Sequence, residues 1–309
     1  MKKNYRILQK FLNYIISKIF SLILKPFNYK IVPNLSDIEK FDFDYSESTR
    51  RLVIKNNKRK FGKIIVDTSL FQSSLCEIGK NYNTNKSPYN LIGHRSGYTG
   101  LYYLLFSQLQ NKELVVAELG IEKNASTKLW RDFFIKSEIH GFEFEKEKLA
   151  NALKDNLSNT FYHKIDSGSP ESIKNAFEKT GKKFDIIIDD STHFFDHQIN
   201  IIFNSHNYLK ENGILIIEDI YKYKNGYEEE KYYEKIFPIR NEFENIFFIE
   251  TPHINNFTAS WKNDKLLLLI KNNKLEKIIK IHKIISRTFN KKIMIFLLKI
   301  FLYVKFHYF

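Results

Sequence analysis

The sequence predicts an α/β protein with a doubly wound, mostly parallel sheet. Between residues 114 and 221, short apolar runs alternate with segments of helical period, which is typical of strand–helix–strand units. Two successive runs also stop abruptly on acidic pairs, Asp189-Asp190 and Glu218-Asp219. Ligands of open α/β sheets bind beyond the carboxyl ends of the strands, so these pairs lie where chemistry is expected.

The elements of this sheet can be read in order along the chain. An apolar helix is expected at 101–109, after a loop-like stretch at 75–100 that is rich in Gly, Asn, Ser and Pro. The pattern then becomes regular, with strands expected at 114–119, 138–142, 160–164, 184–189 and 213–217, and helices at 126–134, 146–156, 170–179 and 196–211. After Tyr221 the alternation ends, and 246–250 with 266–270 predict an antiparallel hairpin at one edge of the sheet.

Four segments follow from these patterns. We expect a basic amphipathic helix at 1–33, a cap or lid segment at 34–110, the α/β domain at 111–270, and a basic amphipathic helical extension at 271–309. The chain of 309 residues is 43% hydrophobic and 27% charged, which indicates a globular protein. Its single cysteine, Cys76, excludes an intramolecular disulfide and fits a reducing compartment.

The net charge of +14 belongs to the two ends of the chain. Residues 1–30 carry +7 and residues 271–309 carry +9, which leaves −2 for the middle of the chain. A nucleic-acid enzyme is disfavoured, because its basic surface should surround the active site. Neither end has an uncharged run of about 18 residues, so a spanning helix is not expected.

The basic ends have two interpretations. They can lie on an anionic membrane surface, which predicts a cytoplasmic protein peripheral to the inner face of the membrane. They can equally pack on the domain or on a second subunit, which leaves a homo-oligomer open. No signal-peptide cleavage site is expected at the N-terminus.

The residues at the ends of the first two strands of the regular region are typical of an adenosine-binding site. A turn at Gly120 follows Glu118, and Glu143 ends the next strand 23 residues after Gly120. Such a turn brings backbone N–H groups to a ligand, and the acid accepts hydrogen bonds from ribose hydroxyls. One glycine instead of three favours a ligand without a pyrophosphate, such as S-adenosyl-L-methionine, whose amino group Glu118 could bind. Asp166 is a further acid after the third strand.

On these residues the chain resembles the class I S-adenosylmethionine-dependent methyltransferases, which have a Rossmann-like fold. Over about 75–270 it is similar to the metal-dependent sugar O-methyltransferases of the macrocin and mycinamicin type. The resemblance rests on four motifs: Tyr82-Asn83-Thr84-Asn85-Lys86 with Gly97-Tyr98-Thr99; Glu118-Leu119-Gly120 with Ser126 and Trp130-Arg131-Asp132; Asp189-Asp190-Ser191-Thr192-His193; and Glu218-Asp219. Asn124, Ala125 and Ser191 stand where that group usually has glycine, and Asn tolerates a left-handed backbone.

The resemblance implies a set of cofactor-binding residues. In addition to Glu118, Gly120, Glu143 and Asp166, it assigns Thr84, Lys86, Tyr98, Ser126 and Asp189 to the S-adenosyl-L-methionine side. Within the first acidic pair, Asp189 is expected to have a supporting role and Asp190 to be the metal ligand.

The acidic pairs predict a metal site. If the two strands are neighbours, about 4.8 Å apart, Asp190, Glu218 and Asp219 converge on one point. Like charges so close need a counter-charge, and a hard divalent cation, Mg²⁺ above all, suits oxygen ligands. The resemblance places the metal on the same three residues. Capping of the following helix is the simpler alternative for an Asp-Asp pair.

The expected reaction is metal-assisted methyl transfer to a sugar hydroxyl, with His193 as general base. The acceptor is expected to be a surface glycan precursor of polysaccharide biosynthesis, which can be lipid-linked, or a glycosylated metabolite. Two alternatives stay open: a methyltransferase acting on a catechol or another small diol, and a catalytically degenerate scaffold protein of polysaccharide assembly.

Overall fold

The computed structural model describes residues 61–90, 94–257 and 262–273. The predicted helix at 1–33 lies outside these residues, as does the extension at 271–309 apart from its first three residues. In the described part of the chain, no helix is both long and apolar enough to cross a membrane.

The described residues form one mixed sheet of eight strands in the order β1-β7-β8-β6-β5-β2-β3-β4. β8 runs antiparallel to β6 and β7, and every other neighbouring pair is parallel. The predicted doubly wound, mostly parallel fold is confirmed. The strands are β1 (Phe61–Ile65), β2 (Val115–Leu119), β3 (Glu138–Glu143), β4 (Thr160–Lys164), β5 (Phe184–Asp189), β6 (Leu209–Ile217), β7 (Phe243–Glu250) and β8 (Lys265–Lys271).

The antiparallel pair of β7 and β8 is confirmed, but it is not the edge of the sheet. β8 lies between β7 and β6, and β1 adds outside β7 in a parallel register that pairs Phe61 with Ile246. The edge strand thus comes from the segment that we assigned to a cap. Its run of five residues is too short for periodicity alone to place it.

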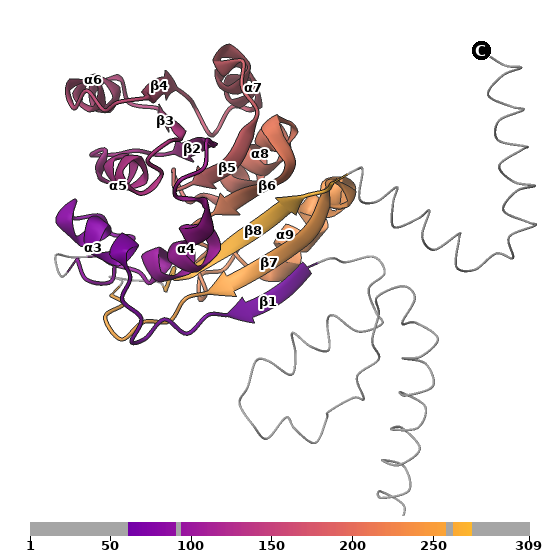
Figure 1. The fold of residues 1–309 in the computed structure, drawn as a ribbon. Coiled ribbons are helices and arrows are strands. Elements are labelled where there is room, and N and C mark those ends of the chain that lie inside the picture. The colour runs from indigo at the N-terminus through magenta and orange to yellow at the C-terminus, as the bar shows by residue number, and fades with distance from the viewer. Residues whose placement is uncertain (1–60, 91–93, 258–261, 274–309) are drawn as a thin grey trace, which may run out of the picture. The chain divides into compact units, whose positions relative to one another are not determined.

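Helices cover both faces of the sheet, as Figure 1 shows. α3, α4 and α5 pack on one face, and α7, α8 and α9 pack on the other. α3 and α9 were not predicted; the side chain of Ser73 accepts a hydrogen bond from the Cys76 N–H and so caps α3. The helices are α3 (Ser74–Asn81), α4 (Tyr98–Phe106), α5 (Ala125–Phe133), α6 (Lys146–Lys154), α7 (Pro170–Thr180), α8 (Phe195–Ser205) and α9 (Glu229–Ile236).

The helix expected at 196–211 is shorter than predicted. α8 ends at Ser205, a single 3-10 turn follows, and β6 already begins at Leu209. The register of β6 against β5 shifts in this stretch, and Asn212 has a left-handed φ of 62°. The polar residues 210–212 therefore belong to a bulged strand and not to the end of a helix.

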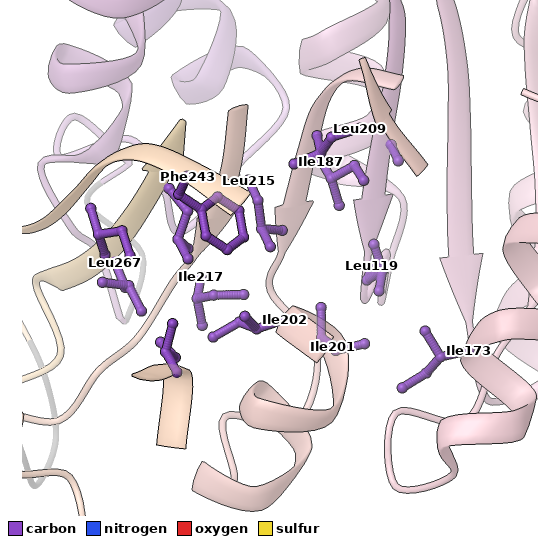
Figure 2. Close-up of a cluster of buried hydrophobic side chains, with 14 of the residues drawn as sticks. Leu119, Ile173, Ile187, Ile201, Ile202, Leu209, Leu215, Ile217, Phe243 and Leu267 are labelled. Carbon is purple, nitrogen blue, oxygen red and sulfur yellow. The ribbon is translucent and has the colours of Figure 1, made fainter. Parts of the chain in front are cut away.

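The core between α8 and the sheet fixes the two acidic strands. In Figure 2, Ile201 and Ile202 of α8 lie toward Leu119 of β2 and Ile217 of β6. These side chains are fully buried. Packing on this face holds β2, β5 and β6 in register, so that their carboxyl ends meet at one rim of the sheet.

Candidate active site

A cavity of about 870 Å³ lies at the carboxyl ends of β2 to β5. It is bordered by the loops that follow these strands and by the segment before α4. Its volume suits a small-molecule site. Seven of the predicted site residues line it: Thr84, Gly120, Ser126, Glu143, Asp166, Asp190 and His193.

The loop after β2 has the backbone that a ligand turn needs. Gly120 has a left-handed φ of 85°, and a Cβ there would lie 2.7 Å from the carbonyl carbon of Asp190. Asn124 has a φ of 62°, so the left-handed conformation expected for this replacement of glycine is confirmed. Its side-chain amide donates to Asp155 and to the Tyr162 hydroxyl, which holds the loop against α6 and β4.

Glu143 is presented to the cavity by backbone donors. Its Oε1 accepts from the N–H groups of Phe144 (2.8 Å) and Glu145 (3.1 Å), and its Oε2 accepts from Glu122 (3.2 Å). Oε2, with a single backbone donor, has a further acceptor site for a ligand hydroxyl. Asp166 lines the same wall and accepts from the Gly168 N–H.

Asp189 is the last residue of β5 and Asp190 follows it, so their side chains leave the sheet on opposite faces. Asp189 points to the α7 and α8 side, where its Oδ1 accepts hydrogen bonds from Ser191. It is 2% exposed and is not part of the cavity wall, and burial raises its pKa to about 6. Asp190 points to the opposite face and lines the cavity. α8 begins with Phe194 as its N-cap and has no side-chain cap, so capping does not explain the acidic pair.

Asp190 and the second acidic pair are held by donors from distant segments. The ammonium of Lys86 contacts Asp190 Oδ2 (2.5 Å) and Glu218 Oε2 (2.7 Å), and the Tyr102 hydroxyl donates to Glu218 Oε1. Lys86 is 1% exposed and lies among the acids. It does not line the cavity, although it was expected on the cofactor side.

Asp219 is bound from two sides. Its Oδ1 accepts from the Tyr98 hydroxyl and its Oδ2 accepts from the Asn263 side-chain amide, both at 2.8 Å. Tyr98 therefore supports an acid and does not line the cavity. Burial raises the pKa of Asp219. A left-handed φ of 56° turns Asp219 toward these partners.

His193 faces both acids. Its Nε2 is 3.5 Å from Asp219 Oδ2 and 3.9 Å from Asp190 Oδ1. Its backbone is left-handed, with a φ of 58°, and its carbonyl accepts from the Tyr227 hydroxyl at 2.9 Å. A non-glycine residue in this region is strained, and such residues often occur at functional sites.

The donor set fits a divalent cation. One ligand atom from each of Asp190, His193 and Asp219 lies within 4.8 Å of the others. The carboxylates of Asp190 and Asp219 suit Mg²⁺ or Mn²⁺, which prefer oxygen ligands, and the imidazole of His193 lies beside them. Glu218, the third predicted ligand, is 1% exposed and is contacted by the Lys86 ammonium and the Tyr102 hydroxyl.

Glu118 lies below the cavity and not in its wall. It is fully buried, its Oε2 accepts from the Thr127 hydroxyl, and its Oε1 lies 3.7 Å from the Lys86 ammonium without a hydrogen-bond partner. Burial raises the pKa of this carboxyl. Oε1 thus has the Lys86 ammonium as an ion-pair partner and lies below the cavity wall.

Tyr102 and Asn263, which support the acids, are not predicted from the sequence. Tyr102 lies four residues after Tyr98, so both hydroxyls lie on one face of α4, and this spacing could have revealed it. Asn263 lies in the connection between β7 and β8, where nothing in the local sequence points to Asp219.

No family model matches the chain. One curated protein does: the 8-demethyl-8-(2-methoxy-alpha-L-rhamnosyl)-tetracenomycin-C 3'-O-methyltransferase of Streptomyces olivaceus, with 28% identity over 140 residues. The predicted resemblance to sugar O-methyltransferases is confirmed. The match covers 42% of this chain and 34% of the relative, so the chain spans about a third of that protein's length.

Solved structures of low identity are also similar. MycE methyltransferase from the mycinamycin biosynthetic pathway, in complex with Mg and SAH, gives a TM-score of 0.49 at 16% identity, over 77% of this chain and 62% of that chain. A putative O-methyltransferase from Klebsiella pneumoniae gives a TM-score of 0.43 at 11% identity, over 66% of this chain and 92% of that chain.

Proposed function

We propose that this protein is an S-adenosyl-L-methionine-dependent O-methyltransferase that acts on a sugar hydroxyl with the help of a divalent metal. One observation carries the proposal. A single cavity has the ribose-type acid Glu143 on one wall and the Asp190–His193 pair on another. A methyl donor and a hydroxyl acceptor bound in such a cavity would lie side by side.

The cofactor half is supported by the β2 and β3 loops. Glu143 is fixed by three backbone N–H groups, which leaves one acceptor site on Oε2 for a ribose hydroxyl. Gly120 allows the β2 loop to press against the Asp190 backbone, which brings the two halves of the rim together. The curated relative is by its name an O-methyltransferase, and its similarity supports this cofactor.

The catalytic half is supported by the acids and His193. Asp190 and Asp219 would hold the metal ion, which when bound lowers the pKa of a coordinated sugar hydroxyl. Nε2 of His193 would accept the proton, because it faces both carboxylates and Asp219 stabilises the resulting imidazolium. Tyr98 and Asn263 fix Asp219, and Tyr227 fixes the backbone of His193.

The proposed reaction transfers a methyl group from the cofactor sulfur to a sugar oxygen. The sugar oxygen gains the methyl group, the carbon–sulfur bond breaks with its electron pair going to sulfur, and the hydroxyl proton goes to His193. Most of the rate acceleration would come from positioning the two substrates in one cavity.

A sugar is the acceptor class that we propose, because the curated relative carries a methoxy-rhamnosyl tetracenomycin in its name. A role in surface polysaccharide synthesis, with a lipid-linked acceptor at the inner face of the membrane, is a further part of the proposal. It draws on the charges of +7 and +9 at the two ends of the chain. A catechol-type diol is the second candidate, since two vicinal hydroxyls would meet the same acids and His193.

The proposal can be tested in two stages. Calorimetry should first detect S-adenosylhomocysteine binding to the full chain in the presence of Mg²⁺. Transfer of a labelled methyl group should then be measured on a panel of rhamnosides, other glycosides and catechols, with wild type, Asp190→Asn and His193→Gln. We expect transfer to a glycoside, abolition by EDTA, and a loss of about 10²–10⁴-fold in kcat for His193→Gln with unchanged cofactor affinity.

Other results would redirect the assignment. Transfer to catechols alone would favour the second candidate. Absence of cofactor binding at millimolar concentration would favour a scaffold protein instead of an enzyme. Equal, metal-independent transfer by Asp190→Asn and wild type would contradict the metal-assisted mechanism.

A further inference from the structure

A second cavity, of about 480 Å³, lies beside the segments that hold the catalytic residues. It is lined by side chains of β1, β7 and β8, by the loop after β6 and by the first turn of α9. The strands contribute Lys63, Glu250 and Lys265, and the loop contributes Tyr223 and Tyr227. Its volume suits a small-molecule site, and the proposed transfer reaction does not use it.

Tyr227 belongs both to this cavity and to the support of the catalytic histidine. It lines the cavity, and its hydroxyl donates to the His193 carbonyl at 2.9 Å. The ring of Tyr221, two residues after Asp219, packs edge-on against the Tyr227 ring, with the centroids 5.0 Å apart. One tyrosine side chain thus connects His193 to the second cavity. Neighbouring rings of an oligosaccharide, joined through one glycosidic oxygen, are separated by a comparable length.

The charged side chains that line the cavity balance one another. They are four lysines and four glutamates: Lys63, Lys222, Lys224, Lys265, Glu228, Glu229, Glu230 and Glu250. Ion pairs fix several of them, among them Lys222–Glu250 at 3.1 Å and Lys265–Glu229 at 2.6 Å. A charged ligand would meet as many like charges as opposite ones, whereas a hydroxyl can accept from an ammonium and donate to a carboxylate. The lining therefore favours a neutral ligand with several hydroxyls.

Two ammonium groups in the lining have donors to spare. Lys265 is 6% exposed, and its ammonium bonds to Glu229. The ammonium of Lys222 lies 3.1 Å from Glu250 and 3.2 Å from Asp264. Because an ammonium has three N–H donors, these contacts, within the part of the chain that the structure describes, leave at least one donor on each lysine for a ligand hydroxyl.

Tyr223 adds an aromatic side chain to this polar lining. It is 69% exposed and borders the cavity. A tyrosine combines an apolar ring with a hydroxyl tip, and a sugar ring combines C–H faces with a rim of hydroxyls. An aglycone of fused aromatic rings would need a mainly apolar cavity instead. The lining therefore suits a sugar unit better than an aromatic aglycone.

We propose that the cavity bordered by Tyr223 and Tyr227 binds a neutral sugar unit of the acceptor, next to the unit that is methylated. The inference rests on the sugar acceptor proposed above and deepens it. An acceptor with two or more sugar units would fill both cavities, whereas a single sugar on an aromatic aglycone would not. A glycan precursor is thereby favoured over a metabolite that carries one sugar.

The first test measures sugar binding to the full chain by saturation-transfer NMR titration. S-adenosylhomocysteine and Mg²⁺ are present, so that no methyl group is transferred. The probes are the methyl glycosides of rhamnose, glucose, galactose and mannose, each as the monosaccharide and as the homodisaccharide. We expect at least one disaccharide to bind wild type about tenfold more tightly than its monosaccharide, and Tyr223→Ala to remove this advantage. If no disaccharide has the advantage, or if Tyr223→Ala keeps it, the inference is overturned.

Phe237→Ala is the matched control. Phe237 is also an exposed aromatic residue with a cation over its ring, as Tyr223 is, but it lines neither cavity. This variant should keep the full preference for the disaccharide, and an equal loss in both variants would refute the specific role of Tyr223. Sulfate at constant ionic strength is the charged competitor. It should not displace the disaccharide, and displacement would show an anion site instead.

A second measurement needs no variant. Crystals of wild type with the tightest-binding disaccharide should show one sugar unit against Tyr223, with its hydroxyls on the ammonium groups of Lys222 and Lys265. A second unit bound elsewhere would overturn the inference. Neither measurement depends on methyl transfer. A disaccharide held in this cavity by a protein that methylates no glycoside would uphold the inference and contradict the proposed function, and transfer to glycosides without any disaccharide preference would do the reverse.

Discussion

Gly120 in the loop after β2 packs directly on the backbone of Asp190 after β5. A Cβ at Gly120 would lie 2.7 Å from the carbonyl carbon of Asp190 and 2.7 Å from the Cα of Ser191. The Asp190 N–H in turn donates to the Leu119 carbonyl at 2.8 Å. The loop of the cofactor half and the acid of the metal half are thus one packed unit, and a change in the first should be felt in the second.

Gly120→Ala should damage both stability and ligand binding. The new methyl group meets fixed backbone atoms at a φ of 85°, so we expect a loss of about 1–3 kcal/mol of unfolding free energy. Urea denaturation followed by circular dichroism measures it, and calorimetry should show weaker binding of both S-adenosylhomocysteine and Mg²⁺.

Gly181→Ala is the matched control. Gly181 also has a left-handed φ, of 64°, but nothing lies within 4 Å of its added Cβ. This variant should lose only the backbone contribution, about 1 kcal/mol, and should bind both ligands as wild type does. Identical losses in the two variants would show that contact with Asp190 is unimportant.

Glu143→Gln should weaken cofactor binding without unfolding the protein. The carboxylate collects three backbone N–H donors, and an amide can accept at only one of its two former oxygen positions. We expect about tenfold weaker S-adenosylhomocysteine binding by calorimetry, equivalent to about 1.4 kcal/mol. Glu147→Gln, on the exposed side of α6, should bind as wild type does. Unchanged affinity in Glu143→Gln would remove this residue from the cofactor site.

The rim of the sheet could be predicted from the sequence because it is encoded locally. Apolar runs that end in acids announce strands, and the period of two assigns Asp189 and Asp190 to opposite faces. The prediction of Asp190 as a metal ligand rested on the meeting of two strand ends and on the resemblance, and the structure places Asp190 in the cavity wall. Glu143 could also be predicted from the sequence, because it lies at a strand end and at a fixed sequence distance from Gly120.

The partners of the acids could not be predicted in the same way. Lys86 lies 104 residues from Asp190, and Asn263 lies 44 residues from Asp219, so both contacts depend on how the layers pack. The motif that contains Lys86 identified the residue but not its place among the carboxylates. The edge strand β1 could not be predicted for a related reason, because it is recognisable only through its pairing with β7.

Tyr102→Phe should destabilise the fold through Glu218. The lost hydroxyl leaves a buried carboxylate oxygen without its donor, which costs about 1–3 kcal/mol. Urea denaturation should detect this loss. Tyr103→Phe is the control, because the ring of Tyr103 packs on Phe71 and Phe133 and the substitution preserves that packing. A Tyr102→Phe protein as stable as wild type would mean that Lys86 alone satisfies Glu218.

The His140–His163 pair should make stability depend on pH. The two rings stack, and Nδ1 of His140 lies 2.8 Å from Nε2 of His163, while Nε2 of His140 bonds to Glu138. This geometry needs a neutral imidazole on each side: His163 donates to His140, and His140 donates to Glu138. Burial lowers the pKa of His163 to about 4.

The sign of the effect follows from the lowered pKa. The unfolded chain takes up a proton on His163 near its ordinary pKa of about 6.5, whereas the folded chain does so only near pH 4. The contribution to stability is therefore complete above about pH 6.5 and is lost as the pH falls toward 4. Between pH 7 and pH 5 we expect wild type to lose about 1–2 kcal/mol more unfolding free energy than His163→Phe, which cannot titrate. Urea denaturation at the two pH values measures this difference, and parallel losses in both proteins would show that His163 is not held neutral in the fold.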